Sequence, residues 1–435
     1  MRREQLIMIC TSDIAGQVRG KAIPLRDLDR RRSRGVGWTP TNIMITAHGP
    51  IAPSPWGAFG DLWLDPDLAT RVDLAFGDDL ASESFVLADV RELDGKPWTC
   101  CLRSFLKRGL AELEAETGLR LVAAFEHEFT YTGVEEAPNA SYALDAFRRQ
   151  GVFGECLIAA LRAAGLEPDT FMPEYGPTQY EITIGPRTGV AAADQAVVLR
   201  ELVRGVAERL GERASFTPQL RPDTVGNGVH VHFSLVDAQN RSVCQVANSA
   251  DGMSAEAGAF LAGVLAKMPA LCALTAASTI SYMRLVPHKW SAAYNNLGRQ
   301  DREAGLRICP VFSDGDRAGQ VHFEYRAADA SASPYLVLGG LVWAGLWGMR
   351  NKLAAPAVTD RDPAAMTADE LAGLGLERLP TSLGAALDRL EADTDVRGWL
   401  GPELTRAYLA HKRFEVELMA DADAAEQCRR YGLAY

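Results

Sequence analysis

The segment that most constrains the fold is residues 121–131, LVAAFEHEFTY, a strand-like run with two glutamates two positions apart. Successive side chains of a β-strand point to opposite faces, so Glu126 and Glu128 share one face while Phe125 and Phe129 lie on the other. One face is therefore apolar and suited to packing, and the other is acidic. The run predicts a strand that is buried on one face and presents two carboxylates on the other.

Three further segments repeat this alternation with different polar groups: residues 179–184 around Glu181, residues 229–235 with His230 and His232, and residues 322–326 around Glu324. A single strand of this kind is more often half-exposed, with solvated charges, than a ligand set. Four with the same design favour a common pocket of carboxylates and imidazoles. Like charges packed so closely repel unless cations lie between them, and such oxygen-rich sets suit Mg²⁺ or Mn²⁺ better than zinc.

The composition is that of an ordinary soluble globular protein, with 435 residues of which 47% are hydrophobic and 23% charged. Such a length suggests two or three domains. The formal net charge of −11 argues against nucleic acid or an anionic membrane as a partner. The eight cysteines show no paired spacing apart from the adjacent Cys100 and Cys101, and the N-terminus does not resemble a signal peptide, so we expect a reducing cytoplasm.

Residues 335–349 are the most apolar run, and at 15 residues they are too short to span a bilayer. They predict a buried helix that begins near Pro334. Helical spacing also predicts helices over residues 104–116, 145–164, 191–210 and 253–276, and a capping box at residues 367–370. No phosphate-binding glycine loop or dinucleotide fingerprint is present in the sequence.

The first region comprises residues 1–98, with strand-like runs at residues 5–10 and 85–90 and a turn at residues 92–97 that marks its end. Residues 46–61 hold three prolines and three glycines, so they predict a loop. Their apolar content is high for a solvated loop, and we therefore expect this loop to cover something.

Arginines gather in the later part of the chain, at Arg284 and again at Arg299, Arg302 and Arg307. In an acidic protein such arginines are usually surface ion pairs. Beside metal-binding carboxylates they instead suggest recognition of phosphate or carboxylate groups, because the guanidinium fork is bidentate.

Together these segments resemble the glutamine synthetase family over about residues 85–350. The motifs are Phe125-Glu-His-Glu128, Glu174-Tyr-Gly-Pro-Thr-Gln-Tyr-Glu181, Gly226-Asn-Gly-Val-His-Val-His232, Arg284-Leu-Val-Pro287, the segment from Arg302 to Arg307, and Glu324-Tyr-Arg326 with Asp329 and Ser333-Pro-Tyr335. The resemblance implies an α+β fold with a small N-terminal β-grasp domain (residues 1–98) and a catalytic domain (residues 99–435) built on a curved antiparallel sheet. It also implies homo-oligomeric rings, dodecamers or similar, in which the neighbour's N-terminal domain closes each active site.

The resemblance also assigns roles by position. The ligands of one divalent cation match Glu128, Glu174 and Glu181, and those of a second match Glu126, His230 and Glu324. Contacts to ATP phosphates fall on His232, Arg302 and Arg307. The positions that hold the amino-acid substrate and its transferring phosphate in the family match Gly226, Arg284 and Arg326. The implied cofactors are ATP and at least two Mg²⁺ or Mn²⁺ ions, with Arg284, Arg302 and Arg326 as catalytic groups.

These residues fit the formation of an amide from a carboxylate. ATP would phosphorylate the γ-carboxylate of glutamate, because a carboxylate needs a better leaving group, and an amine would then attack the acyl phosphate. Metals and arginines neutralise the charge on the moving phosphoryl group.

The chain departs from the family where ammonia-using members hold ammonium. Ammonia-using members have an Asp-Gly-Ser-Ser loop, and this chain has Ala47-His-Gly-Pro50 in its place. They also have a glutamate six residues after the arginine of Arg-Leu-Val-Pro, and this chain has Trp290 there. An asparagine near the substrate's α-amino group is Val225, and an arginine two residues before the last metal glutamate is His322. Both ammonium-binding acids are therefore missing.

An indole at Trp290 fills volume and offers an apolar or cation–π wall, to which the covering loop adds Trp56 and Phe59. The alternative is that Trp290 merely packs beneath that loop. We expect a γ-glutamyl amine ligase that prefers a primary monoamine or arylamine to ammonia. The alternatives are a true glutamine synthetase in which other acids fill the role, and a non-catalytic structural or regulatory relative.

Overall fold

The computed structural model describes residues 3–138, 140–245, 252–311 and 317–435. The first region forms a six-stranded sheet in the order β2-β1-β6-β4-β3, with β5 also paired to β6. Its strands are β1 (Leu6–Ser12), β2 (Val18–Pro24), β3 (Val36–Trp38), β4 (Leu62–Pro66), β5 (Val72–Leu74) and β6 (Glu83–Glu92), and the helix α1 (Leu28–Arg31) follows β2. The strands predicted at residues 5–10 and 85–90 are confirmed as β1 and β6, which pair in parallel.

The second sheet has ten strands in the order β16-β13-β14-β15-β12-β7-β9-β8, with β10 and β11 also paired to β7. Its strands are β7 (Arg120–Tyr131), β8 (Pro168–Pro173), β9 (Gln179–Ile184), β10 (Arg187–Thr188), β11 (Ala214–Ser215), β12 (Val229–Val236), β13 (Leu297–Arg299), β14 (Leu306–Ile308), β15 (Phe323–Tyr325) and β16 (Val358–Thr359). All four segments with alternating polar faces are strands of this one sheet.

The sheet is antiparallel from β14 to β8, as expected, but β13 pairs in parallel with both β14 and β16. The sheet is therefore mixed at this edge. The segment between β13 and β14, which contains Gln300 at a φ of 56°, brings the chain back before β14 begins. The two short strands consequently run in the same direction.

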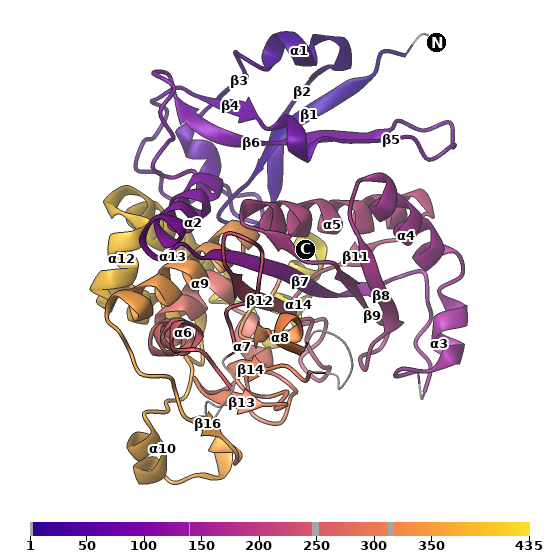
Figure 1. The fold of residues 1–435 in the computed structure, drawn as a ribbon. Helices are drawn as coiled ribbons and strands as arrows, with labels where there is room; N and C mark the ends of the chain where they lie inside the picture. The colour runs from indigo at the N-terminus through magenta and orange to yellow at the C-terminus, as the bar shows by residue number, and fades with distance from the viewer. Residues whose placement is uncertain (1–2, 139, 246–251, 312–316) are drawn as a thin grey trace.

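Helices cover the apolar face of the second sheet, and they include α2 (Leu102–Thr117), α5 (Val190–Arg209), α6 (Ala255–Thr275) and α9 (Pro334–Arg350). Of these, α2 and α5 lie between the two sheets (Figure 1). The helix α2 ends at Gly118, whose φ of 72° is left-handed, as expected of a glycine stop. The helix α9 begins at Pro334, which confirms the predicted buried helix.

The segment expected to form one helix over residues 145–164 forms two helices in the structure. Residues 145–164 form α3 (Leu144–Arg149) and α4 (Phe153–Ala163), and the break lies at Gly151, which has a φ of 64°. A left-handed residue cannot continue a right-handed helix, so the amphipathic pattern is interrupted there although its period carries on.

The remaining helices are α7 (Ser281–Arg284), α8 (Arg317–Gln320), α10 (Ala368–Leu374), α11 (Leu383–Ala392), α12 (Thr394–Leu400), α13 (Pro402–Met419) and α14 (Ala424–Ala434). The capping box predicted at residues 367–370 is present at the start of α10. The helix α6 is long and apolar enough to cross a bilayer by composition, yet 89% of its most apolar window is buried inside the protein. It is the core helix against which α9 packs.

Candidate active site

The strand register brings the predicted polar residues together on one face of the second sheet. His230 lies directly opposite Glu126, Glu181 opposite Glu128, and Glu324 between His232 and Arg307 on its two neighbouring strands. Directly opposed residues of an antiparallel pair have their Cβ atoms roughly 5 Å apart. The convergence expected from the four sequence patterns is thus a consequence of β15, β12, β7 and β9 being consecutive in the sheet.

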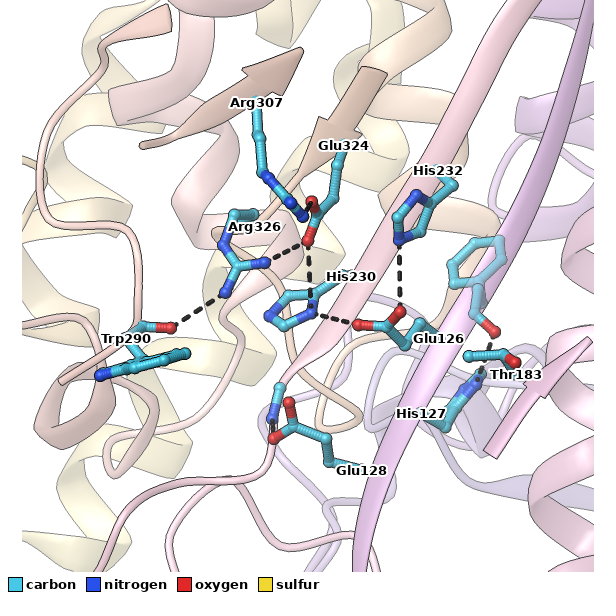
Figure 2. Close-up of polar contacts among 12 residues, drawn as sticks. Glu126, His127, Glu128, Thr183, His230, His232, Trp290, Arg307, Glu324 and Arg326 are labelled. Atoms are coloured by element: carbon cyan, nitrogen blue, oxygen red, sulfur yellow. Dashed lines mark hydrogen bonds and ion pairs between the residues drawn. The ribbon is translucent and has the colours of Figure 1, made fainter. Parts of the chain in front are cut away.

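Glu126 lies between the two histidines of β12 (Figure 2). Its Oε1 is 2.7 Å from His230 Nδ1, and its Oε2 is 3.4 Å from His232 Nε2. Burial by itself would raise the pKa of Glu126, but the hydrogen bonds from His230 and His232 hold that pKa well below its usual value.

Glu324 is buried among cationic groups. Arg307 donates to its Oε2 at 2.7 Å, Arg326 donates to its Oε1, and His230 Nδ1 lies 3.5 Å from Oε1. Although burial opposes ionisation, Arg326 and His230 lower the pKa of Glu324 to about 2. One donor atom each from Glu126, His232 and Glu324 lies within 4.8 Å of the others, so these three residues could hold a cation, and His230, the imidazole expected there, lies 2.7 Å from Glu126.

The other end of the cluster gathers three carboxyl groups, those of Glu128, Glu174 and Glu181, whose ionisation is disfavoured. Burial, followed by the charge of Glu174, raises the pKa of Glu128 to about 7. Burial and the charge of Glu126 raise the pKa of Glu181 to about 10. Burial also raises the pKa of Glu174, which follows β8 and accepts hydrogen bonds from its neighbour's backbone and from Tyr142. Three carboxylates that resist ionisation together are a donor set suited to a hard divalent cation.

The expected substrate-side residues lie beside this cluster. Arg284 donates to Ser291 Oγ at 2.9 Å and to the Ala328 carbonyl at 2.5 Å. A Cβ on Gly226 would lie 2.6 Å from Arg284 Cδ and 2.5 Å from the Pro218 carbonyl, so only glycine fits. Among the described side chains, the Nε–H groups of Arg284, Arg307 and Arg326 are buried without a hydrogen-bond partner.

Arg302 lies apart from the Glu324 cluster. Its side chain is exposed, and it is near enough to Glu174 for its charge to favour the ionised carboxylate. The structure thus brings Arg307 and Arg326 to Glu324 and Arg302 to the opposite end of the site.

Trp290 forms a surface wall next to Arg326. Its carbonyl accepts a hydrogen bond from Arg326 at 3.1 Å (Figure 2). Trp290 is 65% exposed. The backbone N–H groups of His288 and Trp290 both donate to the carboxylate of Glu303, at 3.0 Å each. Sequence patterns did not single out Glu303, which adjoins Arg302 and lies in no strand.

A cavity of about 440 Å³ opens on the other side of Glu126. Its lining includes Glu126, Thr183, His232, Ser234, Gln320 and His322. These residues come from β7, β9, β12 and the segment before β15, so the cavity lies over the polar face of the sheet.

Family models match almost the whole chain. The glutamine synthetase N-terminal domain matches residues 1–98, and the glutamine synthetase catalytic domain matches residues 99–431. The chain belongs to the glutamine synthetase family. The expected family and α+β fold are thereby confirmed, and enzymes of this family use ATP and divalent metals.

Among its curated relatives, this glutamine synthetase family ligase is 34% identical to the γ-glutamylpolyamine synthetase GlnA3 of Streptomyces coelicolor, over 93% of this chain and 88% of that protein. It is 28% identical to the glutamine synthetase of Pyrococcus horikoshii, over 97% and 91% of the two chains. Among solved structures, a novel glutamine synthase homologue is 40% identical, with a TM-score of 0.92 and coverage of 100% and 99%. Unliganded GmaS is 26% identical, with a TM-score of 0.81 and coverage of 99% and 97%.

The loop of residues 46–61 lies on the C-terminal helices of the same chain in this family member. His48 packs edge-on against Tyr431 of α14, with ring centroids 4.6 Å apart. Trp56 packs against Trp98 and donates to Glu403 of α13 at 3.0 Å, whereas Phe59 is 83% exposed. Within one chain this loop thus covers α13 and α14, and a role over an active site would require a neighbouring subunit.

Proposed function

We propose that this protein is an ATP-dependent ligase that forms a γ-glutamyl amide from glutamate and an organic amine through a γ-glutamyl phosphate. The observation that carries the proposal is Trp290. The family's acidic residue for ammonium is replaced there by an indole that is 65% exposed and attached through its backbone to Arg326. The packing alternative for Trp290 has little support within one chain, because a packed tryptophan would be buried.

The two ends of the carboxylate cluster would hold the cations. Glu128, Glu174 and Glu181 supply one oxygen-rich set, and Glu126, Glu324 and an imidazole of β12 supply the other. Bound Mg²⁺ or Mn²⁺ would neutralise charge on the transferring phosphoryl group. The ATP phosphates would lie against His232, Arg302 and Arg307.

The arginines would bind the acid substrate and orient the acyl phosphate. Arg326 is fixed by Glu324 on one side and by the Trp290 carbonyl on the other, which aims its planar fork across the site. Arg284 closes against Gly226, so the backbone of that loop can approach a substrate closely. Both groups would stabilise negative charge that develops as the amine attacks.

The amine would approach beside Trp290. The indole offers an apolar or cation–π surface. The carboxylate of Glu303 lies close by, where it accepts a hydrogen bond from the backbone N–H of Trp290. The relative named as a γ-glutamylpolyamine synthetase supports an organic amine over ammonia. A true glutamine synthetase would require an acid such as Glu303 to replace both missing ammonium ligands.

Phosphate release with ATP, glutamate and Mg²⁺ tests the function. The amine series should include ammonia, alkylamines, arylamines, diamines and polyamines, with each γ-glutamyl product verified by mass spectrometry. We expect the highest kcat/KM with an organic amine. If kcat/KM were highest with ammonia, the protein would be a true glutamine synthetase. If no amine led to phosphate release, the protein would be a non-catalytic relative.

Substitution of Trp290 by alanine separates amine recognition from the rest of the reaction. Because the indole contacts only the amine in our proposal, W290A should lower kcat/KM for organic amines while the value for ammonia changes little. The ratio of the two values serves as an internal control for folding and metal binding. An unchanged ratio would remove Trp290 from the amine site.

We also propose homo-oligomeric rings in a reducing cytoplasm. The family resemblance supports the rings, and the eight cysteines, all of which are free thiols in this structure, are compatible with the compartment. Mass photometry of the purified protein tests the assembly, for which we expect a closed ring rather than a monomer.

A further inference from the structure

Beside the carboxylate cluster, three adjacent strands bring one thiol and two imidazoles together. Cys309 directly follows β14, and its backbone N–H donates to the His322 carbonyl at 3.2 Å, which continues the β14–β15 ladder by one pair. His232 of β12 lies opposite Glu324, two residues from His322. Since residues two apart share a face, all three side chains lie on the face that carries Glu324.

The donor atoms of these three residues are close enough for one metal ion. One ligand atom from each lies within 4.8 Å of the others, and Cys309 Sγ is 3.9 Å from His232 Nδ1. In a tetrahedral zinc site, with Zn–S about 2.3 Å and Zn–N about 2.0 Å, a sulfur and a nitrogen ligand are roughly 3.5 Å apart. The observed separation therefore needs only a small adjustment.

A hydrogen bond on His322 and an ion-pair contact on His232 involve the outer nitrogens and orient the two imidazoles for this role. His322 Nδ1 is 2.8 Å from the Gln320 carbonyl, to which it must donate, so Nε2 keeps its lone pair. His232 Nε2 lies 3.4 Å from Glu126 Oε2, and Nδ1 faces the thiol. A carbonyl or carboxylate behind each ligating histidine is the usual outer arrangement of zinc sites.

We propose that Cys309, His232 and His322 form a site for a thiophilic divalent cation of the Zn²⁺ class. The thiol would lose its proton to solvent on binding, and the metal–sulfur bond would replace it. Sulfur and nitrogen ligands distinguish this site from the carboxylate sets, which favour Mg²⁺ or Mn²⁺. The three protein ligands leave a fourth position, as in zinc sites that accept an exogenous ligand.

The position of the site gives it a consequence for nucleotide binding. His232 and His322 line the cavity of about 440 Å³ beside Glu126. In the proposed function, on which this step rests, His232 contacts ATP phosphates. A cation held by His232 Nδ1 would occupy that residue and the adjoining cavity wall, so bound Zn²⁺ should weaken ATP binding.

Cobalt titration of the chelator-treated protein tests the metal site without any activity measurement. With saturating Mg²⁺ in the carboxylate sets, Co²⁺ should bind once per chain, with a thiolate-to-metal charge-transfer band in the near ultraviolet and intense tetrahedral bands in the visible. One equivalent of Zn²⁺ should abolish both. Absence of the charge-transfer band in the wild-type protein would overturn the site.

Matched variants identify the ligands. Cys309→Ser should lose the charge-transfer band, and His322→Gln should weaken Co²⁺ binding by at least about tenfold. Cys156→Ser, at a half-buried cysteine in α4, should bind Co²⁺ as the wild type does. Circular dichroism and melting temperature establish that each variant is folded. A charge-transfer band that persists in folded C309S would assign the sulfur ligand elsewhere and overturn the proposal.

Displacement of a fluorescent ATP analogue tests the second step. Zn²⁺ should raise the apparent Kd of the analogue for the wild type but not for C309S. Equal effects on both proteins would overturn the antagonism. If the ligase activity itself were absent, the cobalt spectrum would be unaffected, so failure of the proposed function is distinguishable from failure of the metal site.

Discussion

At the scale of single residues, glutamates of one site differ in their ionisation. The glutamate at one end is stabilised as an anion, whereas the glutamates at the other end resist ionisation. Arg326, His230 and His232 lower the pKa of Glu324 to about 2, whereas burial and neighbouring glutamates raise the pKa of Glu181 to about 10. The protein supplies its own cations to Glu324. In the proposed function, Glu128, Glu174 and Glu181 would depend on a cation from solution.

Replacement of Glu128 or Glu181 by alanine should therefore separate activity from stability. Each variant should lose phosphate release by roughly a hundredfold or more, because a cation loses an anionic ligand. In chelator-treated buffer neither variant should melt below the wild type, because each substitution removes a carboxyl group whose raised pKa reflects unfavourable burial beside other carboxylates. Mg²⁺ should raise the melting temperature of the wild type more than that of either variant.

Glu167→Ala is the matched control, because that glutamate is 72% exposed and lies outside the cluster. It should keep both the activity and the response to Mg²⁺. Near wild-type phosphate release in both E128A and E181A would rule out the metal assignment.

Arg326→Lys should cost far more than a change between cations normally does. Arg326 uses two nitrogens at once, one for Glu324 and one for the Trp290 carbonyl, and a lysine ammonium cannot reproduce that planar geometry. We expect kcat to fall about a hundredfold at saturating ATP and glutamate. The surface variant Arg429→Lys should show no loss, because Arg429 pairs with Glu426 in the same helix, α14, far from the site in sequence. An unchanged kcat in R326K would refute the role of the fork.

At the scale of elements, glycines permit the close packing of the two core helices. A Cβ on Gly263 of α6 would lie 2.1 Å from the Ala344 carbonyl of α9, and a Cβ on Gly348 of α9 would lie 2.1 Å from the Ala259 carbonyl of α6. Backbone atoms cannot move aside as a flexible side chain can. The approach of α6 to α9, and with it the support of the sheet, thus depends on the absence of side chains at these positions.

Gly263→Ala should consequently destabilise the protein by about 1–3 kcal/mol through overpacking, even though alanine is the better helix former. Gly398→Ala tests the opposite outcome, because Gly398 lies in α12 with nothing within 4 Å of its built Cβ. That variant should gain up to about 1 kcal/mol. Thermal unfolding of both variants decides the point, and equal shifts of the same sign would contradict the packing argument.

At the scale of the whole molecule, the C-terminal helices attach the first region to the rest of the chain. His411 of α13 contacts the Ile45 carbonyl through Nε2 at 3.3 Å, Trp56 donates to Glu403, and the Tyr435 hydroxyl donates to the Ala15 carbonyl at 2.7 Å. His411 is fully buried, and burial, aided by Lys412, lowers its pKa to about 3. The contact between the C-terminal helices and the first region therefore contains a neutral imidazole, and its protonation in acid should weaken this contact.

The sign of the pH dependence follows from that shift. The unfolded chain binds a proton at His411 near pH 6.5, whereas the folded chain resists it down to about pH 3, so stability falls as pH falls through this window. Between pH 7 and pH 5 the loss from this residue is roughly 2 kcal/mol. His411→Gln should therefore show a smaller drop in melting temperature between pH 7 and pH 5 than the wild type. His288→Gln, at an exposed histidine whose pKa is raised by Asp362, should not reduce the drop. Identical drops in wild type and H411Q would exclude His411 as an acid-sensitive group.

The sequence alone determined the four half-buried strands, the polar residues on their faces, the start of α9 at Pro334 and the motifs of the family. These features are local, because alternation at a period of two and the conformations of proline and glycine are properties of short segments. The helical period of apolar residues also continues through residues 145–164, although Gly151 divides this segment into two helices, so the period alone does not reveal the break.

The tertiary structure decided which polar groups meet. Cys309 and His232 are 77 positions apart, and only the order β14-β15-β12 places that thiol beside the imidazole. Glu303 reaches the Trp290 peptide through a loop with no strand pattern, and the parallel pairing of β13 depends on the path of residues 300–305. Strand order and register arise from packing between distant segments, so no spacing along the chain encodes them directly.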